Sequence, residues 1–137
     1  MTVRVERTFE LSVPAEDVWE FIADPGKRAS AISVVSDYEE RGDVTVWFVK
    51  LPVLGRTVEV ETRDVERRDG EYVKFVGKSS VLNVTGEHEL EPADDGCRLK
   101  NTFVVEGKLP GVETFFKRRL DGELDSLERE LEEAGHA

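Results

Sequence analysis

The C-terminal stretch GVETFFKRRLDGELDSLERELEEAG, residues 111–135, has the periodicity of one long amphipathic helix. Its apolar residues recur at steps of three or four, which places them on one stripe of a helix with 3.6 residues per turn. They are Val112, Phe116, Leu120, Leu124, Leu127 and Leu131. Pro110 precedes the stripe, where its missing N–H is not needed, and Gly135 suits a left-handed C-terminal cap. A rod of about 36 Å must lie along a surface that buries this stripe.

Most of the chain before this helix has the alternation of strands. Residues 3–11 alternate apolar and polar side chains, as a half-buried strand does. Pro14, followed by Glu16 and Asp17, predicts a short helix that ends at Pro25, and residues 27–32 are expected to form a second. From residue 34 to residue 105, turn signals recur about every 12 residues, which leaves no room for another helix.

The turn signals predict which side chains share one face of the sheet. A two-residue loop at Gly42-Asp43 places Tyr38 opposite Trp47, a tight Asp69-Gly70 turn places Asp64 opposite Phe75, and a turn at Asp95-Gly96 places His88 opposite Phe103. The predicted inward face comprises Tyr38, Trp47, Val49, Val58, Val60, Thr62, Val73, Phe75, Leu82, Val84, His88, Leu90, Leu99, Asn101, Phe103 and Val105. The other face carries Glu59, Glu61, Arg63, Glu87, Glu89, Arg98 and Lys100, which we expect in water.

These elements predict an α+β fold in a single domain, residues 1–137: a strand, two short helices, six further strands and the long helix. An antiparallel sheet of six or seven strands with one apolar face twists and curls. One helix about 10 Å in diameter cannot fill the hollow of such a sheet. We therefore expect a cavity between the sheet and the C-terminal helix.

The charge balance argues against nucleic acid as a partner. Thirty acidic and 19 basic residues give a net charge of −11, whereas phosphate binding needs a basic face. The acidic residues are spread along the chain, which favours a surface adapted to a high-salt, halophilic cytoplasm over a docking site for a basic partner. No stretch has the ~20 apolar residues of a membrane span, and no signal-peptide pattern is present, so we expect a cytoplasmic protein without stable membrane insertion. A single cysteine, Cys97, excludes an internal disulfide.

Three stretches resemble the START-like (SRPBCC) superfamily of polyketide cyclase/dehydrase and lipid-transport domains. They are VPAEDVWEFIADP at 13–25, VTGEHELEPADDGCRLKNTF at 84–103 and LPGVETFFKRRLDGELDSLEREL at 109–131. The last two are most similar to the branch that includes a carbon monoxide dehydrogenase subunit family, although VKFVGKSSVLN at 73–83 replaces the glycine-rich middle of that branch. The resemblance implies a helix-grip fold, a curved sheet wrapped around the long C-terminal helix. It also implies a cavity for hydrophobic molecules such as lipids, sterols, quinones or polyketides. Some members are cyclases or hydrolases, and many have no known reaction.

His88 and Asp64 are the candidate acid–base residues. His88 is on the predicted inward face with Asn101 diagonally across the hairpin, and its ordinary pKa is near neutrality. A hydrogen-bonded wall histidine is the interpretation we prefer. Asp64, beside Thr62, is either a base with a raised pKa or a partner of Arg63 or Arg67. His136 lies in the C-terminal tail.

No motif points to other chemistry. The sequence has no GxSxG elbow, no metal-ligand spacing, no GxGxxG and no P-loop, so we expect no metal and no nucleotide cofactor. The basic triplet Lys117-Arg118-Arg119 either receives an acidic head group or pairs with Glu113, Asp121 and Glu123 at helical spacing.

The hypothesis that follows is sequestration or transfer of a small hydrophobic ligand, without a cofactor. Its predicted lining is Tyr38, Trp47, Val60, Thr62, Phe75, Val84, His88, Asn101, Phe103, Phe115, Phe116 and Leu120. One alternative is a cyclase-, dehydratase- or hydrolase-like enzyme with His88 or Asp64 as general base. Another is an adaptor that uses an outward-facing Phe48 beside Val46. The sequence leaves open the ligand, the reaction and whether the protein is a monomer or a homodimer.

Gly122 lies in the middle of the predicted helix, where glycine costs about 1 kcal/mol relative to alanine. A bend or a close approach of the helix to the sheet would explain it. If the helix bends at Gly122, we expect it to flex at this residue to admit a ligand.

Overall fold

The computed structural model describes residues 2–134. It confirms the predicted α+β helix-grip fold, with one seven-stranded antiparallel sheet, two short helices after the first strand and a long C-terminal helix. In chain order the elements are β1 (Thr2–Leu11), α1 (Ala15–Ile22), α2 (Pro25–Ser30), β2 (Val35–Arg41), β3 (Val44–Leu51), the 3-10 turn η1 (Pro52–Leu54), β4 (Arg56–Arg68), β5 (Tyr72–Lys78), β6 (Leu82–Ala93), β7 (Gly96–Gly107) and α3 (Val112–Ala134). The spatial order of the strands is β1-β7-β6-β5-β4-β3-β2.

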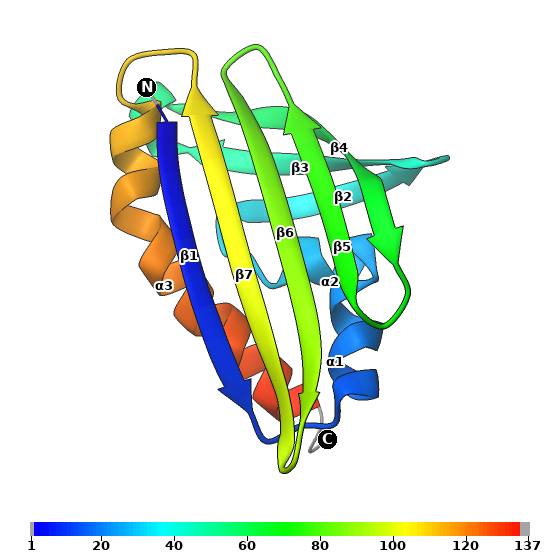
Figure 1. The fold of residues 1–137 in the computed structure, drawn as a ribbon. Coiled ribbons are helices and arrows are strands. Elements are labelled where there is room, and N and C mark those ends of the chain that lie inside the picture. The colour runs from blue at the N-terminus through cyan, green and yellow to red at the C-terminus, as the bar shows by residue number, and fades with distance from the viewer. Residues whose placement is uncertain (1, 135–137) are drawn as a thin grey trace.

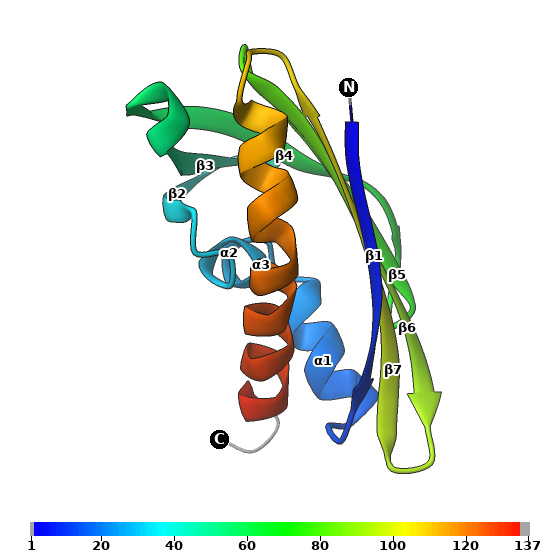
Figure 2. The same ribbon diagram turned by 90° about the vertical axis from the view of Figure 1, so that its left-hand side faces the viewer.

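The sheet bends, and all three helices lie on its concave side (Figures 1 and 2). β1, β7, β6 and β5 run together as long strands, whereas β2, β3 and β4 cross behind them (Figure 1). α3 packs against β1 and β7, α1 packs against α3, and α2 packs against β2. The long helix therefore covers the β1–β7 side of the concave face, and α2 with the following loop covers the opposite side.

Two of the predicted pairings are confirmed. Tyr38 pairs with Trp47 across the two-residue loop, where Gly42 has a φ of +66° that glycine adopts without strain. Asp64 pairs with Phe75, although the β4–β5 turn is one residue longer than predicted. A bulge at Val65 absorbs the extra residue, so the faces beyond it are preserved.

The predicted pairing of His88 with Phe103 is wrong, because the β6–β7 turn is Asp94-Asp95 and Gly96 still belongs to β7. His88 lies directly opposite Asn101. A Cβ added to Gly96 would lie 2.0 Å from the backbone oxygen of Leu11. Glycine is needed there for the close approach of the end of β1, and its φ of +154° also disfavours other residues.

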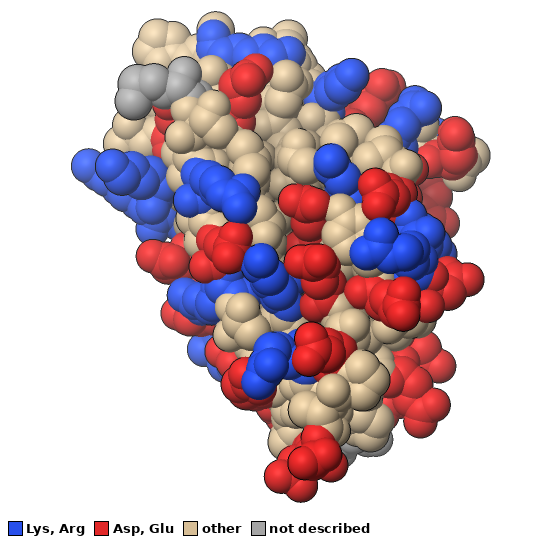
Figure 3. Space-filling model, in the orientation of Figure 1, with Lys and Arg blue, Asp and Glu red and all other residues tan. Residues whose placement is uncertain are grey.

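The concave face has the composition that the alternation predicted. Every residue of the predicted inward face is buried except Tyr38, which is 38% exposed and lies over Gly26 at the edge of the sheet. On the convex face, Lys and Arg are interspersed with Asp and Glu, without a patch of one sign (Figure 3). This face has the character of a surface in contact with water.

The predicted exposure of Phe48 is wrong. Phe48 is half-buried, and its neighbour Val46 is only 1% exposed although both point outward. Their cross-strand partners include Glu59 and Glu61. Long charged side chains of this kind cover apolar surface with their stems while their carboxylates stay in water.

The two short helices begin close to the predicted signals. Pro14 lies one residue before α1, and Asp24 caps α2 by accepting hydrogen bonds from the backbone N–H groups of Gly26 and Lys27. α2 therefore starts two residues earlier than predicted.

α3 begins at Val112, the first residue of the predicted apolar stripe. The predicted cap residue Gly135 and the tail residue His136 lie outside the described residues. A methyl group added to Gly122 would meet no atom within 4 Å. A close approach to the sheet is therefore not the reason for this glycine.

Candidate functional site

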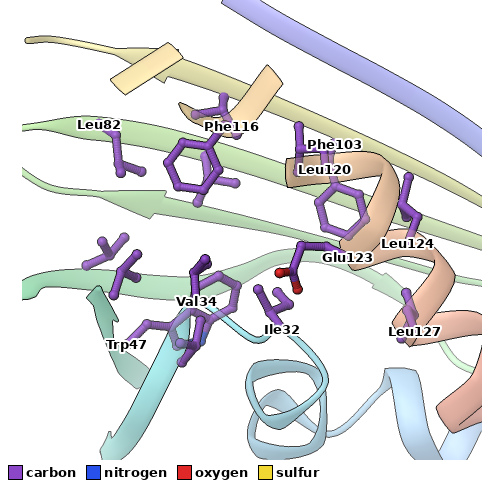
Figure 4. A pocket seen from close by; sticks show the side chains of 15 residues that line it. Ile32, Val34, Trp47, Leu82, Phe103, Phe116, Leu120, Glu123, Leu124 and Leu127 are labelled. Carbon is purple, nitrogen blue, oxygen red and sulfur yellow. The ribbon is translucent and has the colours of Figure 1, made fainter. Parts of the chain in front are cut away.

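An apolar cavity of about 60 Å³ lies between the sheet and α3 (Figure 4). Its walls come from five strands, from α3 and from the loop between α2 and β2. They comprise Ile32, Val34, Val35, Trp47, Val49, Val60, Leu82, Val84, Phe103, Val105, Phe116, Leu120, Glu123, Leu124 and Leu127. Glu123 is the only charged member of this wall.

The structure brings half of the predicted lining residues into this wall. They are Trp47, Val60, Val84, Phe103, Phe116 and Leu120. Tyr38, Thr62, Asn101 and Phe115 do not line it. Thr62 donates a hydrogen bond to the Thr45 carbonyl oxygen at 2.7 Å, and Phe115 packs edge-on against Phe116.

Phe75 and His88 line a second, smaller cavity of about 10 Å³. Its other walls are Ile22, Arg28, Ile32, Phe103 and Leu127. Ile32, Phe103 and Leu127 line both cavities, so the two cavities are adjacent. The surface of the smaller cavity is apolar, although Arg28 and His88 contribute to its walls.

Sequence reasoning missed the residues that close the larger cavity from the α2 side. Ile32, Val34 and Val35 belong to a loop and the first residue of a strand, where no periodicity marks an inward face. Leu124 and Leu127 carried a signal, because they continue the apolar stripe of α3.

Glu123 connects α3 to the loop between α2 and β2 through hydrogen bonds. Its carboxylate accepts a hydrogen bond from the backbone N–H of Ser33 at 2.7 Å and another from the Ser33 hydroxyl. Arg119 lies 3.8 Å from the same carboxylate, which confirms one of the pairings predicted for the basic triplet, and it also donates to the Ser33 hydroxyl. Glu123 is therefore engaged within the protein although it lines the cavity.

His88 is held by Asn101. The two side chains are 2.8 Å apart, between His88 Nδ1 and Asn101 Oδ1. The Asn101 amide nitrogen donates to the carbonyl oxygens of Arg7 and Leu99, which turns its oxygen toward the histidine. His88 Nδ1 must then carry the hydrogen, and the neutral ring has its lone pair on Nε2.

Burial keeps this histidine neutral. The ring is 2% exposed, and desolvation lowers its pKa to about 4 in spite of the bond to Asn101. The nearby charge of Arg28 acts in the same direction. At neutral pH, Nε2 is therefore a hydrogen-bond acceptor.

Arg28 and Asp64 form an ion pair at the side of the smaller cavity. Arg28 Nη2 donates to Asp64 at 2.5 Å and Nη1 donates to the carbonyl oxygen of Ile22 at 3.2 Å. Arg67 donates to the other oxygen of Asp64 at 3.3 Å, so the predicted Arg67 partner is confirmed, and Arg28 is a partner that the sequence did not reveal. Burial lowers the pKa of Arg28, and Asp64 opposes this effect. Asp64 is thus bound to two guanidinium groups instead of facing the cavity alone.

Two buried donors at the cavities lack a hydrogen-bond partner among residues 2–134. They are Nε of Arg28, whose side chain is 5% exposed, and the indole Nε1 of Trp47. Buried polar groups nearly always find a partner, so each unpaired one calls for an explanation. Within the described residues, no three His, Cys, Asp or Glu side chains lie close enough together to hold a metal, and no helix is long and apolar enough to cross a membrane.

Comparison with known proteins agrees with this geometry. The family described as polyketide cyclase / dehydrase and lipid transport matches residues 2–132. No curated protein matches the sequence.

Solved structures share the fold over nearly their whole length. The Zhui aromatase/cyclase from Streptomyces sp. R1128 superposes with a TM-score of 0.74 at 17% identity, covering 98% of this chain and 94% of that one. A START superfamily protein from Mycobacterium smegmatis superposes with a TM-score of 0.73 at 15% identity, covering 97% of each chain. DR_A0006 from Deinococcus radiodurans superposes with a TM-score of 0.67 at 18% identity, covering 96% of this chain and 98% of that one. At such identities the likeness shows the fold alone.

Proposed function

Because this chain belongs to the polyketide cyclase/dehydrase and lipid transport family, we propose that it binds a small hydrophobic molecule between its sheet and α3. The observation that carries the proposal is the cavity wall, in which every residue but Glu123 is apolar. Apolar walls of this kind provide affinity at about 25 cal/mol per Å² of buried ligand surface. Sequestration or transfer of the ligand requires nothing further from the protein.

Binding requires the cavity to expand. About 60 Å³ is less than half of the roughly 150 Å³ at which an apolar protein cavity takes up benzene. The sheet walls are fixed by ladder hydrogen bonds, whereas α3 and the α2–β2 loop are joined mainly by the bonds of Glu123 to Ser33. We expect the ligand to enter by parting these two segments.

A cavity-filling variant tests the proposal. N-phenyl-1-naphthylamine, an uncharged fluorescent probe, should bind the wild type with one-to-one stoichiometry, and Val84→Phe should weaken binding at least tenfold because Val84 lines the cavity. Val65→Phe adds the same group at a valine that is 51% exposed and should bind as the wild type does. Native mass spectrometry of protein purified from its own host should show a retained hydrophobic molecule. If the wild type binds no probe and always purifies empty, the proposal fails.

An enzyme of the cyclase, dehydratase or hydrolase type is the second candidate function. The neutral His88, whose side chain lines the smaller cavity, is the observation that favours it. His88→Gln would then abolish turnover of a hydrophobic substrate while the naphthylamine probe still binds. Unchanged turnover would exclude His88 as the base. Asp64 is a weaker candidate because two arginines already share its carboxylate.

An adaptor function has lost its main support, since Phe48 is half-buried. Light scattering on the wild type and on Phe48→Ser still tests it. A dimer that the variant abolishes would favour an adaptor over a monomeric carrier.

A further inference from the structure

Three segments that are far apart in the sequence meet at one end of the molecule, the top end in Figures 1 and 2. A Cβ added to Gly111 would lie 2.7 Å from the Val53 side chain. Lys108 donates a hydrogen bond to the carbonyl oxygen of Ser79 at 2.7 Å. We call the surface that these segments form the η1 end. It comprises residues 50–56 around η1, residues 77–83 around the β5–β6 turn, and residues 106–119 from the β7–α3 loop into α3.

The η1 end is basic although the protein as a whole is acidic. Its basic residues, all of them exposed, are Lys50, Arg56, Lys78, Lys108, Lys117, Arg118 and Arg119. Its acidic residues are Glu106 and Glu113. Seven basic and two acidic residues give this end a net charge of +5, so the rest of the chain must carry −16 to reach the total of −11. Figure 3 shows Lys and Arg at the top end of the molecule and Asp and Glu at the bottom end.

The positive charges of the η1 end are not neutralised within the protein. Among residues 2–134, Arg119 is the only one of its seven basic residues that forms an ion pair, with Glu123. Elsewhere in the described chain, eight of the twelve basic residues form ion pairs. They are Arg4, Arg7, Arg28, Arg41, Arg67, Arg68, Arg98 and Lys100. The η1 end is therefore available to an anionic partner.

Two aliphatic side chains are exposed on the same end. Val53 is 47% exposed and Leu109 is 39% exposed, and they are two of the four large apolar side chains that are exposed among the described residues. In the sequence, Val53 lies between Lys50 and Arg56, and Leu109 follows Lys108. Apolar side chains among basic ones suit an anionic lipid surface, because the cations approach the phosphate groups while the apolar groups enter the boundary with the acyl chains.

We propose that the η1 end docks onto the surface of an anionic lipid bilayer, with Val53 and Leu109 entering the head-group layer. The acidic remainder of the protein is repelled by such a surface, so the charge asymmetry orients the molecule. The apolar cavity lies directly behind this end, because Val49, Leu82 and Phe116 of its wall belong to the three segments or adjoin them. The inference goes beyond the proposed function, since docking places the cavity next to a source of apolar molecules.

Nucleic acid fits this surface less well. Single strands bind by stacking their bases on aromatic side chains, whereas the exposed apolar side chains of the η1 end are aliphatic.

Co-sedimentation with vesicles tests the proposal. At about 0.1 M salt, where charges attract over about 10 Å, the full chain should bind vesicles of phosphatidylglycerol and phosphatidylcholine in equal amounts. It should bind them at least tenfold more tightly than vesicles of phosphatidylcholine alone, because each Lys or Arg at an anionic surface strengthens binding about fivefold. Equal binding to the two kinds of vesicle, or binding to neither, would overturn the proposal.

Charge-reversal variants test the place of docking. Lys50→Glu combined with Lys117→Glu should weaken binding to the anionic vesicles at least tenfold. Lys27→Glu combined with Arg63→Glu makes the same change in net charge at exposed positions outside the η1 end and should bind as the wild type does. If both pairs weaken binding equally, only the total charge matters and the docking surface is refuted.

The aliphatic side chains distinguish a lipid surface from other polyanions. Val53→Ser combined with Leu109→Ser leaves every charge in place and should weaken vesicle binding at least fivefold. Val65→Ser, at a valine that is 51% exposed outside the η1 end, should have no effect. If the double variant binds as the wild type does, the η1 end attracts anions without lipid contact and the proposal fails.

Hydrogen exchange on the wild type is independent of whether the variants fold. Anionic vesicles should slow amide exchange in residues 50–56 and 106–119 and leave the β6–β7 turn at Asp94-Asp95 unchanged. Protection confined to other segments would refute the docking surface. The naphthylamine probe, added without vesicles, separates the two proposals: its binding to a protein that does not dock would overturn docking alone, and docking of a protein that never binds it would overturn the proposed function alone.

Discussion

Removal of the Asp64 charge should destabilise the protein more than removal of its arginine partner. Arg28 is 5% exposed, whereas Asp64 is 23% exposed and has a second partner in Arg67. Asp64→Asn leaves a buried guanidinium without its counter-charge. Arg28→Met removes the buried charge itself, and the remaining carboxylate keeps water and Arg67.

The magnitude follows from the burial of each partner. Breaking a fully buried pair costs about 3–5 kcal/mol, and partial exposure of Asp64 together with retention of one hydrogen bond by Asn reduces this to about 2 kcal/mol. Arg28→Met should cost about 1 kcal/mol or less, since a methionine fills the same space and the pair no longer has to be desolvated. The double variant should be close to Arg28→Met alone, which corresponds to a coupling energy of about 2 kcal/mol.

Urea denaturation of the four proteins at one ionic strength measures these values. The fitted slopes should agree, so that the midpoints report stability and not a changed unfolded state. The reasoning is refuted if Arg28→Met is the more damaging variant. The packing of Arg28 on Phe75 and its bond to Ile22 would then matter more than the uncompensated charge.

Three further substitutions test other contacts. Gly122→Ala should raise the free energy of unfolding by about 1 kcal/mol, because the added methyl group meets no atom within 4 Å; an unchanged urea midpoint would contradict this. Gly86→Ala should lower the free energy of unfolding by about 2 kcal/mol, because the added Cβ would lie 2.2 Å from the Phe75 ring. Adding Phe75→Leu to this variant should restore part of the lost stability, as measured by urea denaturation. The pKa of His88 is about 4 in the folded protein and about 6.5 when unfolded, so protonation favours unfolding and stability is lost as the pH falls from 6.5 to 4. The stability of the wild type minus that of His88→Gln should fall by an amount on the order of 3 kcal/mol across that window, and a constant difference would show that His88 does not titrate as inferred.

The inward face of the sheet could be predicted because strand geometry repeats every two residues. The β4–β5 turn illustrates how robust this is: the turn was predicted one residue too short, yet Asp64 still pairs with Phe75 because of the bulge at Val65. The β6–β7 turn shows the limit. Gly96 has the sequence signature of a turn, but it is required by the backbone of Leu11, which is 85 positions earlier in the chain and invisible to local reasoning.

The buried polar contacts beside the two cavities join segments that no local pattern relates. Arg28 meets Asp64 across 36 residues, and Ser33 meets Glu123 across 90. In the sequence, Arg28 has the appearance of a solvent-exposed charge on a short helix. Only the packing of α2 against the sheet buries its guanidinium beside His88.

The sequence by itself determined the order of elements, the buried stripe of α3 and the apolar concave face, because backbone geometry imposes fixed periods of 3.6 and 2 residues on burial. The tertiary structure decided how much of the hollow under α3 remains open and which polar side chains are buried beside it. Those quantities depend on side-chain packing between distant segments, where a displacement of one methyl group changes whether a space is filled. The long helix could thus be assigned from its own residues, but the cavity that it closes could not.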